Sequence, residues 1–229
     1  MKLHRTYLTA LRLMSGSVIV ISAVMLAAPL HSEGEEMRIA YEKVLTPADQ
    51  TRAAIVMALR GKLGRNLTDL GRAELAEAVV AAADTHHVDP FLVLSVISVE
   101  SEFKHTALSK RHAQGLMQLK NATAFEWSDK TGIPMAELGL FDETTNVSLG
   151  SAYLKSCHDH LGSWSNALAA YNWGPAKVRR AIKANHGKLP QRMRDYEFRV
   201  AKRYRQFTTM AGFDAKARAA SALRIRESI

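Results

Sequence analysis

The sequence has little of the residues that build stapled, fibrous or metal-bound small folds. It contains one cysteine, Cys157, in 229 residues, which excludes a disulfide scaffold and a zinc-finger type of site, because both need at least two thiols. Six prolines and 13 glycines are too few for a collagen-like or low-complexity chain. Hydrophobic residues make up 47% of the chain and charged residues 23%, so the composition can form a core and excludes a wholly disordered protein.

Acidic residues are outnumbered by basic ones. The chain has 31 Lys and Arg against 22 Asp and Glu, which gives a formal net charge of +9. An excess of this size favours an anionic partner such as nucleic acid, a membrane surface or a cell-wall polymer. The charge alone does not choose among these three.

Residues 1–32 have the pattern of an export signal. The segment begins with three basic residues and no acid, and residues 17–30 are apolar. A run of 14 residues is shorter than the roughly 20 that span a bilayer. We therefore expect a signal peptide cleaved near Ser32, with an uncleaved membrane anchor as the alternative. No cysteine follows the run, which excludes a lipoprotein signal.

Export narrows the choice of compartment and partner. It predicts a periplasmic or other extracytoplasmic location and argues against nucleic acid as the partner. Removing residues 1–32 takes away three positive charges and no acid, which lowers the formal charge from +9 to about +6. In an oxidising compartment we expect the unpaired Cys157 to be a small buried hydrophobe rather than a reactive thiol.

The fold class predicted from the pattern is all-α. Nearly every long segment after residue 32 has helical periodicity, and no alternating strand, internal repeat or low-complexity block stands out. Asp89 and Pro90 read as the N-cap and first residue of a helix. We predict helices over residues 48–60, 72–86, 90–103, 115–130, 144–160, 164–172, 175–184 and 191–207. The predicted regions are a signal peptide at 1–32, a helical extension at 33–70, a core domain at 71–208 and a basic tail at 209–229.

Glu100 is an anomaly on the predicted 90–103 helix. It lies four residues after Val96, three after Ile97 and three before Phe103, so it shares their apolar face. Burial of a carboxylate on that face, near the negative end of the helix dipole, should raise its pKa. A carboxyl group with a raised pKa is suited to general acid catalysis. The alternative is a structural glutamate that pairs with an arginine or caps a backbone group.

Two further stretches carry groups that suit a sugar. Gly115-Leu-Met-Gln-Leu119 places Gln118, which has both a donor and an acceptor, beside a glycine that allows close approach. Ala169-Ala-Tyr-Asn-Trp-Gly-Pro175 places an aromatic ring and an amide just before a helix break, where side chains can face a cleft. Ser109 lies in the loop between Glu100 and the first of these stretches.

Together these motifs resemble the soluble lytic transglycosylase (SLT) domain family, which is related to goose-type lysozyme. The resemblance rests on four ordered motifs over about residues 85–203, which are highly specific in this order although no single one would be. They are Val96-Ile-Ser-Val-Glu-Ser-Glu-Phe103 with Ala107-Leu-Ser109, Ala113-Gln-Gly-Leu-Met-Gln-Leu119, Leu140-Phe-Asp142 with Asn146, Gly150, Tyr153 and Leu154, and Ala167-Leu-Ala-Ala-Tyr-Asn-Trp-Gly-Pro175 followed by Leu189-Pro190, Tyr196 and Val200.

The resemblance implies a lysozyme-like helical domain with a peptidoglycan-binding groove and no cofactor or metal. It implies cleavage of the β-1,4 bond between N-acetylmuramic acid (MurNAc) and N-acetylglucosamine (GlcNAc), with formation of 1,6-anhydro-MurNAc. By motif position Glu100 matches the catalytic residue, which acts first as acid and then as base. The substrate-binding positions that match are Ser109, Met117, Gln118, Tyr171 and Asn172.

The chain departs from the family pattern at several positions, none of them Glu100 or Tyr171. The usual Met-Pro after the GLMQL run is Lys120-Asn121, which puts the neighbouring subsite in doubt. The usual Asn-Pro after the catalytic motif is Lys104-His105, and the usual Glu-Thr of the late motif is Arg192-Met193. We interpret these changes as altered substrate contacts rather than lost activity.

Several alternatives stay open at the level of sequence. Usual glycosidases use two carboxylates, and Asp129, Glu137, Asp142 and Glu143 are available as a second one, although Asp142 is better read as a helix cap. The chain could be a muramidase of the same superfamily or a non-catalytic wall-binding assembly protein.

The predicted partners are glycan strands, secretion or cell-wall machinery and, weakly, a membrane surface. Nucleic acid is not among them, and we predict that the protein is a monomer. The run Cys157-His158-Asp159-His160 groups metal-ligand types, but adjacent helical positions point apart.

Overall fold

The computed structural model describes residues 46–137 and 139–211. The predicted signal peptide, its cleavage position and residues 212–229 of the predicted basic tail lie outside the described residues. The chain divides into two compact units, Met1–Ala53 and Ala54–Ile229, and the site discussed below lies in the second. The elements in chain order are α4 (Pro47–Leu59), η1 (Lys62–Gly64), α5 (Asp69–His86), α6 (Pro90–Glu100), α7 (Asn121–Thr131), η2 (Gly139–Phe141), α8 (Glu143–Leu161), α9 (Trp164–Trp173), α10 (Pro175–Ala184) and α11 (Gln191–Met210).

The all-α prediction is confirmed. Over the described ranges the secondary structure is helical, apart from isolated bridges that join Gln114 to Leu108 and to Leu119. Helices α5, α6, α8 and α9 begin at residues whose side chains accept from the first free backbone N–H groups. Asp89 accepts from two amides at the start of α6, and Asp142 accepts from one at the start of α8. Both had been predicted as helix caps.

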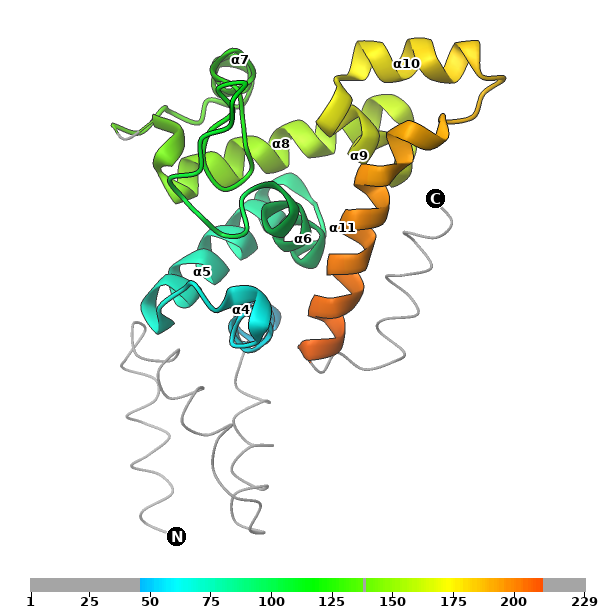
Figure 1. The fold of residues 1–229 in the computed structure, drawn as a ribbon. Coiled ribbons are helices and arrows are strands. Elements are labelled where there is room, and N and C mark those ends of the chain that lie inside the picture. Colours follow the sequence, from blue (N-terminus) through cyan, green and yellow to red (C-terminus); the bar gives the residue numbers. More distant parts are fainter. Residues whose placement is uncertain (1–45, 138, 212–229) are drawn as a thin grey trace, which may run out of the picture. The chain divides into compact units, whose positions relative to one another are not determined.

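Helix α6 is a buried helix that packs between α5 and α11. Its residues Phe91 to Ser98 are all buried, and it contacts α5 on one side and α11 on the other (Figure 1). Two tyrosines of α11 donate hydrogen bonds to its two ends. Tyr204 donates to Asp89 at 2.8 Å, and Tyr196 donates to Glu100 at 2.6 Å. Helix α11 therefore holds both the first and the last turn of α6.

The structure corrects several of the predicted helix boundaries: α5 begins at Asp69, not at residue 72, and α11 ends at Met210, not at residue 207. Helix α6 ends at Glu100, not at Phe103, because Glu102 and Phe103 adopt positive φ angles of 51° and 66°. This turn returns the Phe103 ring to the core, 6.0 Å from the ring of Phe207. The predicted 115–130 helix begins only at Asn121.

Residues 115–120 form turns, not the first part of a helix. Gln114 and Leu119 exchange both backbone hydrogen bonds, at 2.8 and 3.0 Å, and Gly115 and Gln118 have φ angles of +76° and +50°. A β-carbon on Gly115 would lie 2.1 Å from the carbonyl oxygen of Leu140. Only glycine fits there, in both space and backbone conformation.

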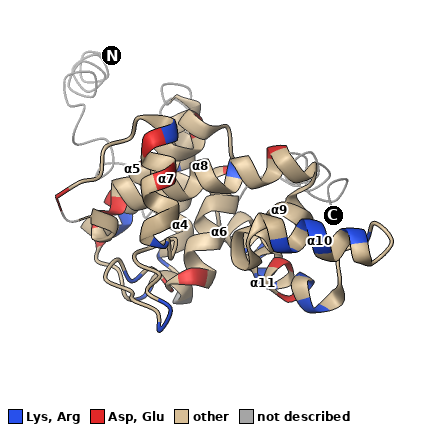
Figure 2. Ribbon diagram, turned by 90° about the horizontal axis from the view of Figure 1, so that it is seen from above, with Lys and Arg blue, Asp and Glu red and all other residues tan. Residues whose placement is uncertain are grey.

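Lysine and arginine gather on α10, α11 and the 104–111 loop (Figure 2). Helix α10 carries exposed basic residues on its outer face, and Lys104, Lys110 and Arg111 are exposed in the loop. None of the helices in the described part of the chain combines the length and the hydropathy needed to cross a membrane.

Candidate active site

Glu100 is the last residue of α6 and is only partly exposed. Burial raises the pKa of its carboxyl group above the usual value, while the hydrogen bond from Tyr196 and the positive charge of Arg199 act in the opposite direction. The net shift is upward, because desolvation is the largest of the three effects. The raised pKa expected from the helix pattern is thereby confirmed in direction and cause.

Tyr196 and Arg199 are the partners of Glu100 that the sequence interpretation did not identify. Tyr196 is buried on α11 and lies 96 positions from Glu100 in the chain. A signal was present, because Met193, Tyr196 and Val200 recur at helical spacing on the buried face of α11. A phenol on such a face needs a hydrogen-bond partner, although the sequence does not say which.

Asn146 on α8 organises the turn at residues 114–117. Its side chain is fully buried and accepts from the backbone N–H of Met117 at 2.7 Å. Its amide nitrogen donates to the carbonyl oxygens of Gln114, at 3.0 Å, and Leu140, at 2.9 Å. All of its hydrogen bonds therefore fix backbone groups of the 114–117 turn and of η2. The sequence placed Asn146 in a motif but gave it no role.

Met117 lies in the core, not on a groove surface. Its exposed fraction is 0%, and it packs so closely on Gly150 of α8 that a β-carbon there would lie 2.5 Å from its sulfur. The expected side-chain contact with substrate therefore has no surface to act through in this conformation. Its carbonyl oxygen accepts a hydrogen bond from Tyr171 at 2.8 Å. Met117 thus joins α8, the turn and α9.

Tyr171 lies in the same electrostatic environment as Glu100. Burial raises the pKa of the Tyr171 phenol, and the negative charge of Glu100 raises it further. The same causes, in the same order, raise the pKa of Tyr196. The structure therefore brings together Glu100 and Tyr171, as expected, and adds Tyr196 as a third member.

Gln118 and Ser109 hold the shape of the loop as well as facing outward in part. The amide nitrogen of Gln118 donates to the carbonyl oxygens of Ala107, at 3.0 Å, and Gly115, at 2.9 Å. Only its carbonyl oxygen then remains for a ligand. The Ser109 hydroxyl accepts from the backbone N–H of Ala113 at 2.9 Å, which leaves its proton free to be donated.

A row of aromatic rings leads to the site from α7. Trp127 and Tyr153 lie 6.1 Å apart between ring centroids, and Tyr153 and Tyr171 lie 5.2 Å apart. At the end of α9, Asn172 and Trp173 are exposed. Asn172 is thus placed where a ligand could reach it.

The other candidate carboxylates have different surroundings. Asp142 accepts from the backbone N–H of Thr145 at 2.7 Å as the cap of α8. Glu143 lies 3.7 Å from His105, and burial raises the pKa of its carboxyl group as well. Asp129 and Glu137 are exposed. Within the described ranges, no aspartate or glutamate is among the groups that shift the pKa of Glu100.

The Cys157–His160 run points in several directions, as the helical spacing predicts. Cys157 is buried, as expected, and burial raises the pKa of its thiol to about 12. The His158 ring stacks on Trp164 with centroids 4.2 Å apart. His160 Nδ1 lies 2.7 Å from the carbonyl oxygen of Ser156.

Taken together, the geometry supplies a carboxyl group at the end of α6 that stays protonated to a higher pH than usual. The Tyr196 hydroxyl and the positive charge of Arg199 stabilise the Glu100 carboxylate after it has lost its proton. The 115–119 turn is linked to this group through Tyr171, whose pKa the Glu100 charge raises and whose hydroxyl donates to Met117. Such a site can donate a proton to a leaving group and then accept one back.

Comparison with curated proteins finds relatives with lytic transglycosylase names. The chain is 30% identical over 145 residues to a membrane-bound lytic murein transglycosylase C of Edwardsiella ictaluri, covering 58% of this chain and 40% of that one. It is 32% identical over 122 residues to the protein of the same name from Photorhabdus laumondii, covering 48% and 34%. The chain thus spans 40% or less of the length of these relatives.

Two solved structures share the fold. One is the lytic transglycosylase Slt of Pseudomonas aeruginosa in an inactive mutant form, with a TM-score of 0.54 at 22% identity, over 86% of this chain and 36% of that one. The other is the 70 kDa soluble lytic transglycosylase SLT70 of Escherichia coli, with a TM-score of 0.57 at 18% identity, over 88% and 37%. At these identities the likeness concerns the fold alone.

The family comparison covers the site itself. The profile described as the transglycosylase SLT domain matches residues 77–193, which is just over half of the chain and includes Glu100, the 115–119 turn and Tyr171. The resemblance noted in the sequence is therefore confirmed, and the chain belongs to the transglycosylase SLT domain family.

Proposed function

We propose that this chain is an exported peptidoglycan lytic transglycosylase that cleaves the MurNAc–GlcNAc β-1,4 bond and forms 1,6-anhydro-MurNAc. The observation that carries the proposal is the half-buried Glu100, which accepts a hydrogen bond from Tyr196. Burial raises the pKa of its carboxyl group. The membership of the SLT family and the names of the relatives support the choice of substrate and reaction.

In the first step Glu100 acts as general acid. Its proton passes to the glycosidic oxygen as the bond to C1 of the muramyl sugar breaks, and the GlcNAc-side hydroxyl leaves. Positive charge that develops at C1 is stabilised by the sugar's own acetamido group. The resulting Glu100 carboxylate is stabilised by the Tyr196 hydroxyl and the Arg199 charge, because both favour the ionised form.

In the second step the same carboxylate acts as general base. It takes the proton of the C6 hydroxyl of the muramyl sugar while that oxygen attacks C1, which closes the 1,6-anhydro ring. Glu100 regains its proton, so the cycle balances without water and without a second carboxylate. The arrangement around Glu100 suits this use, because burial favours its protonated form while Tyr196 and Arg199 favour its ionised form.

The remaining site residues take binding or positioning roles in this proposal. Ser109, Gln118 and Asn172 contact the sugars through the polar atoms that their loop contacts leave available. Met117 and Tyr171 have a positioning role, because the hydrogen bond between them fixes the turn that carries Gln118. The cell envelope is the proposed location, supported by the apolar N-terminal run and by the names of the relatives.

The direct test replaces Glu100 by glutamine. We expect Glu100→Gln to keep the fold and to lower the release of soluble muropeptides from purified sacculi by roughly 100- to 10,000-fold, because general acid–base catalysis contributes about 10²–10⁴-fold to the rate. Glu77→Gln is the matched control, since Glu77 is exposed on α5, and it should keep full activity. Mass spectrometry of the wild-type products should give anhydro ends.

The products decide between the proposal and its alternatives. Reducing ends, heavier than anhydro ends by one water, would assign the chain to the muramidases instead. Sedimentation with sacculi without any soluble product would assign it to non-catalytic wall binding. Retained turnover in Glu100→Gln would overturn the role of Glu100.

A further inference from the structure

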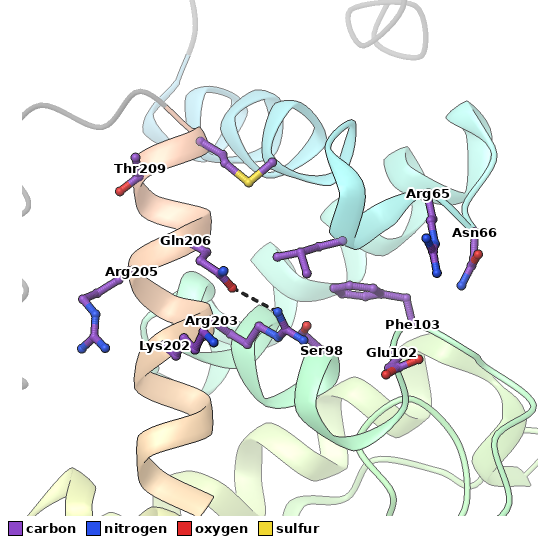
Figure 3. A pocket seen from close by; sticks show the side chains of 12 residues that line it. Arg65, Asn66, Ser98, Glu102, Phe103, Lys202, Arg203, Arg205, Gln206 and Thr209 are labelled. Atoms are coloured by element: carbon purple, nitrogen blue, oxygen red, sulfur yellow. Dashed lines mark hydrogen bonds between the residues drawn. The ribbon is translucent and has the colours of Figure 1, made fainter.

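A cleft of about 870 Å³, here called the α11 cleft, opens between α11, the last turn of α6 and the segment after η1 (Figure 3). The polar residues of its lining that matter here are Arg65, Ser98, Lys202, Arg203, Arg205 and Gln206. Glu100, Tyr196 and Arg199 are not among the described residues that line it. The α11 cleft is therefore separate from the candidate active site and offers a place for a different ligand.

Ser98 of α6 is a buried polar residue in this lining, and only 3% of it is exposed. Ser95, on the same helix, and Ser101, directly after it, each donate to the backbone carbonyl oxygen four residues earlier. The Ser98 hydroxyl has no such bond and no other hydrogen-bond partner among the described residues, and its side chain lies at the cleft beside Arg203 (Figure 3). A buried hydroxyl without a partner is costly, so the cleft favours a ligand that supplies an acceptor.

Arg203 of α11 extends into the cleft from the other side. It is half-buried, and its Nη1 donates to the side-chain oxygen of Gln206 at 3.1 Å. Figure 3 shows the guanidinium directed across the cleft toward Ser98. A guanidinium has five N–H groups, so this one bond leaves donors for a ligand. Arg203 and Ser98 therefore present donors to the same part of the cleft.

The α11 cleft also has an excess of positive charge. Its lining contains Arg65, Lys202, Arg203 and Arg205 against a single acid, Glu102. In the part of the chain that the structure describes, no carboxylate lies within ion-pair distance of any of these four basic groups. The charge that the protein leaves unneutralised favours an anionic ligand.

We propose that the α11 cleft binds a phosphate ester, with the phosphate group between Ser98 and Arg203. A phosphate monoester carries roughly two negative charges at pH 7 and three acceptor oxygens. Its tetrahedral oxygens can accept from a guanidinium on one side and a hydroxyl on another. A carboxylate is planar, and one guanidinium fork satisfies both of its oxygens. The donors on two sides of the cleft therefore suit a phosphate better than a carboxylate.

The size of the α11 cleft indicates that the ligand is larger than inorganic phosphate. A phosphate ion would fill a small part of a cleft of about 870 Å³. Leu63 and Met210 add apolar surface to the lining, which suits the organic group of an ester. Arg65 precedes the family match over residues 77–193, and Lys202, Arg203 and Gln206 follow it. The α11 cleft thus adds a binding site that does not depend on the reaction at Glu100.

The test uses the full chain and glycerol 3-phosphate as the probe, by isothermal titration calorimetry in phosphate-free buffer at constant ionic strength. We expect glycerol 3-phosphate to bind roughly ten-fold more tightly than glycerate, which carries a carboxylate on a similar body. Arg203→Gln should weaken this binding roughly ten-fold, because it removes charge-assisted hydrogen bonds. Ser98→Ala should weaken it roughly five-fold, because one neutral hydrogen bond is lost.

Each variant has a matched control. Arg180→Gln removes the same charge from the exposed face of α10, and Ser95→Ala removes a hydroxyl of α6 that bonds to the backbone. Both controls should keep the affinity of the wild type, and circular dichroism checks that every variant is folded. Equal affinity for the two probes, no binding of glycerol 3-phosphate, or an equal loss in variants and controls would overturn the proposal.

Vesicles distinguish the two sources of a phosphate ester, a lipid headgroup and a soluble compound. Phosphatidylglycerol vesicles that bind to the wild type but not to Arg203→Gln would identify the ligand as a lipid. Binding of glycerol 3-phosphate that needs Arg203, together with vesicle binding that is absent or does not need Arg203, would identify a soluble ester.

Release of soluble muropeptides from sacculi tests whether the α11 cleft is separate from the active site. Ser98→Ala and Arg203→Gln should both release muropeptides at the rate of the wild type. A loss of release in Arg203→Gln as large as its loss of phosphate binding would place the cleft in the glycan groove and overturn a separate site. A wild type that releases nothing but binds glycerol 3-phosphate through Arg203 would refute the proposed function and support the phosphate site.

Discussion

Glu100 combines opposing influences that suit a residue used twice in one cycle. Burial favours its protonated form, and Tyr196 and Arg199 favour its ionised form. A carboxyl group buried with no such partners would hold its proton too firmly to donate it. One with stronger partners would lose its proton before substrate arrives. The balance supports a single group that serves as acid and then as base.

The hydrogen bond from Tyr196 gives a prediction for the pH dependence of activity. This bond lowers the pKa of Glu100, so Tyr196→Phe should raise that pKa further. The reaction needs protonated Glu100, and activity falls as the pH rises through its pKa. We therefore expect the alkaline limb of kcat/KM to move to higher pH. The maximum should fall roughly ten- to hundred-fold, because a hydrogen bond to the ionised group is worth about 1.5–3 kcal/mol.

Tyr204→Phe is the matched control for this experiment. Tyr204 lies on the same helix and donates a bond of similar length to Asp89 at the other end of α6. Its loss should lower stability by a comparable amount and leave the pH profile in place. If both variants move the profile equally, or if neither moves it, Tyr196 does not act on the proton of Glu100.

For single residues, the sequence identifies the catalytic candidate Glu100 better than it identifies the residues that contact Glu100. Glu100 could be found because Val96 and Ile97, on the same helix, define the apolar face that it shares. Tyr196 could not be assigned to it, because the contact joins residues 96 positions apart and depends on how α11 crosses α6. Asn146 shows the same limit, since its hydrogen bonds reach up to 32 positions along the chain.

At the level of the elements, the packing of the 115–119 turn against α8 determines where the turn places its residues in the site. Gly150 lets Met117 lie directly against α8, and the Met117 carbonyl in turn holds Tyr171. A side chain at position 150 would push the turn away from the helix. The position of the Gln118 carbonyl oxygen therefore depends on a glycine in another element.

Gly150→Ala should therefore destabilise the protein, although alanine is the better helix former. A β-carbon there would lie 2.5 Å from the sulfur and 2.9 Å from the β-carbon of Met117. Overpacking of this kind costs about 1–3 kcal/mol, which exceeds the gain of about 1 kcal/mol in helix propensity. We expect a lower free energy of unfolding in urea and lower kcat/KM, through displacement of the turn.

Gly71→Ala is the control, because its β-carbon would lie no closer than 3.3 Å to the Thr68 hydroxyl at the start of α5. It should be neutral or stabilising and leave activity unchanged. Equal stability of the Gly150 and Gly71 variants would show that the turn yields without cost, against the prediction.

Helices were predicted well where periodicity is uninterrupted and poorly where backbone geometry decides. Helices α8, α9 and α10 begin and end within one residue of the predicted ranges, because caps and a Gly-Pro break mark their ends. The GLMQL run has apolar residues at helical spacing and was taken for a helix. It forms turns because Gly115 and Gln118 adopt positive φ and Asn146 satisfies the freed backbone groups.

In the whole molecule, the excess of basic residues and the proposed catalytic carboxyl group lie in different parts of the chain. The formal charge of +9 concentrates on the 104–111 loop, α10 and α11 (Figure 2), whereas catalysis is proposed for one carboxyl group. Part of the excess lies in the predicted signal peptide, and part lies on α11. The remainder is exposed and suited to hold the protein on an anionic polymer.

Retention on the wall should therefore depend on salt, and the Glu100→Gln protein allows this to be measured without digestion of the sacculi. Exposed charges are screened over about 10 Å at 0.1 M salt and about 3 Å at 1 M. We expect the fraction that sediments with sacculi to fall several-fold between these concentrations. Uncharged chitin offers similar sugars without carboxylates, and binding to it should change little. Salt-insensitive retention on sacculi would mean that contacts with the glycan hold the protein in place, because screening acts on the exposed charges of α10 and the loop but leaves hydrogen bonds to sugars largely intact.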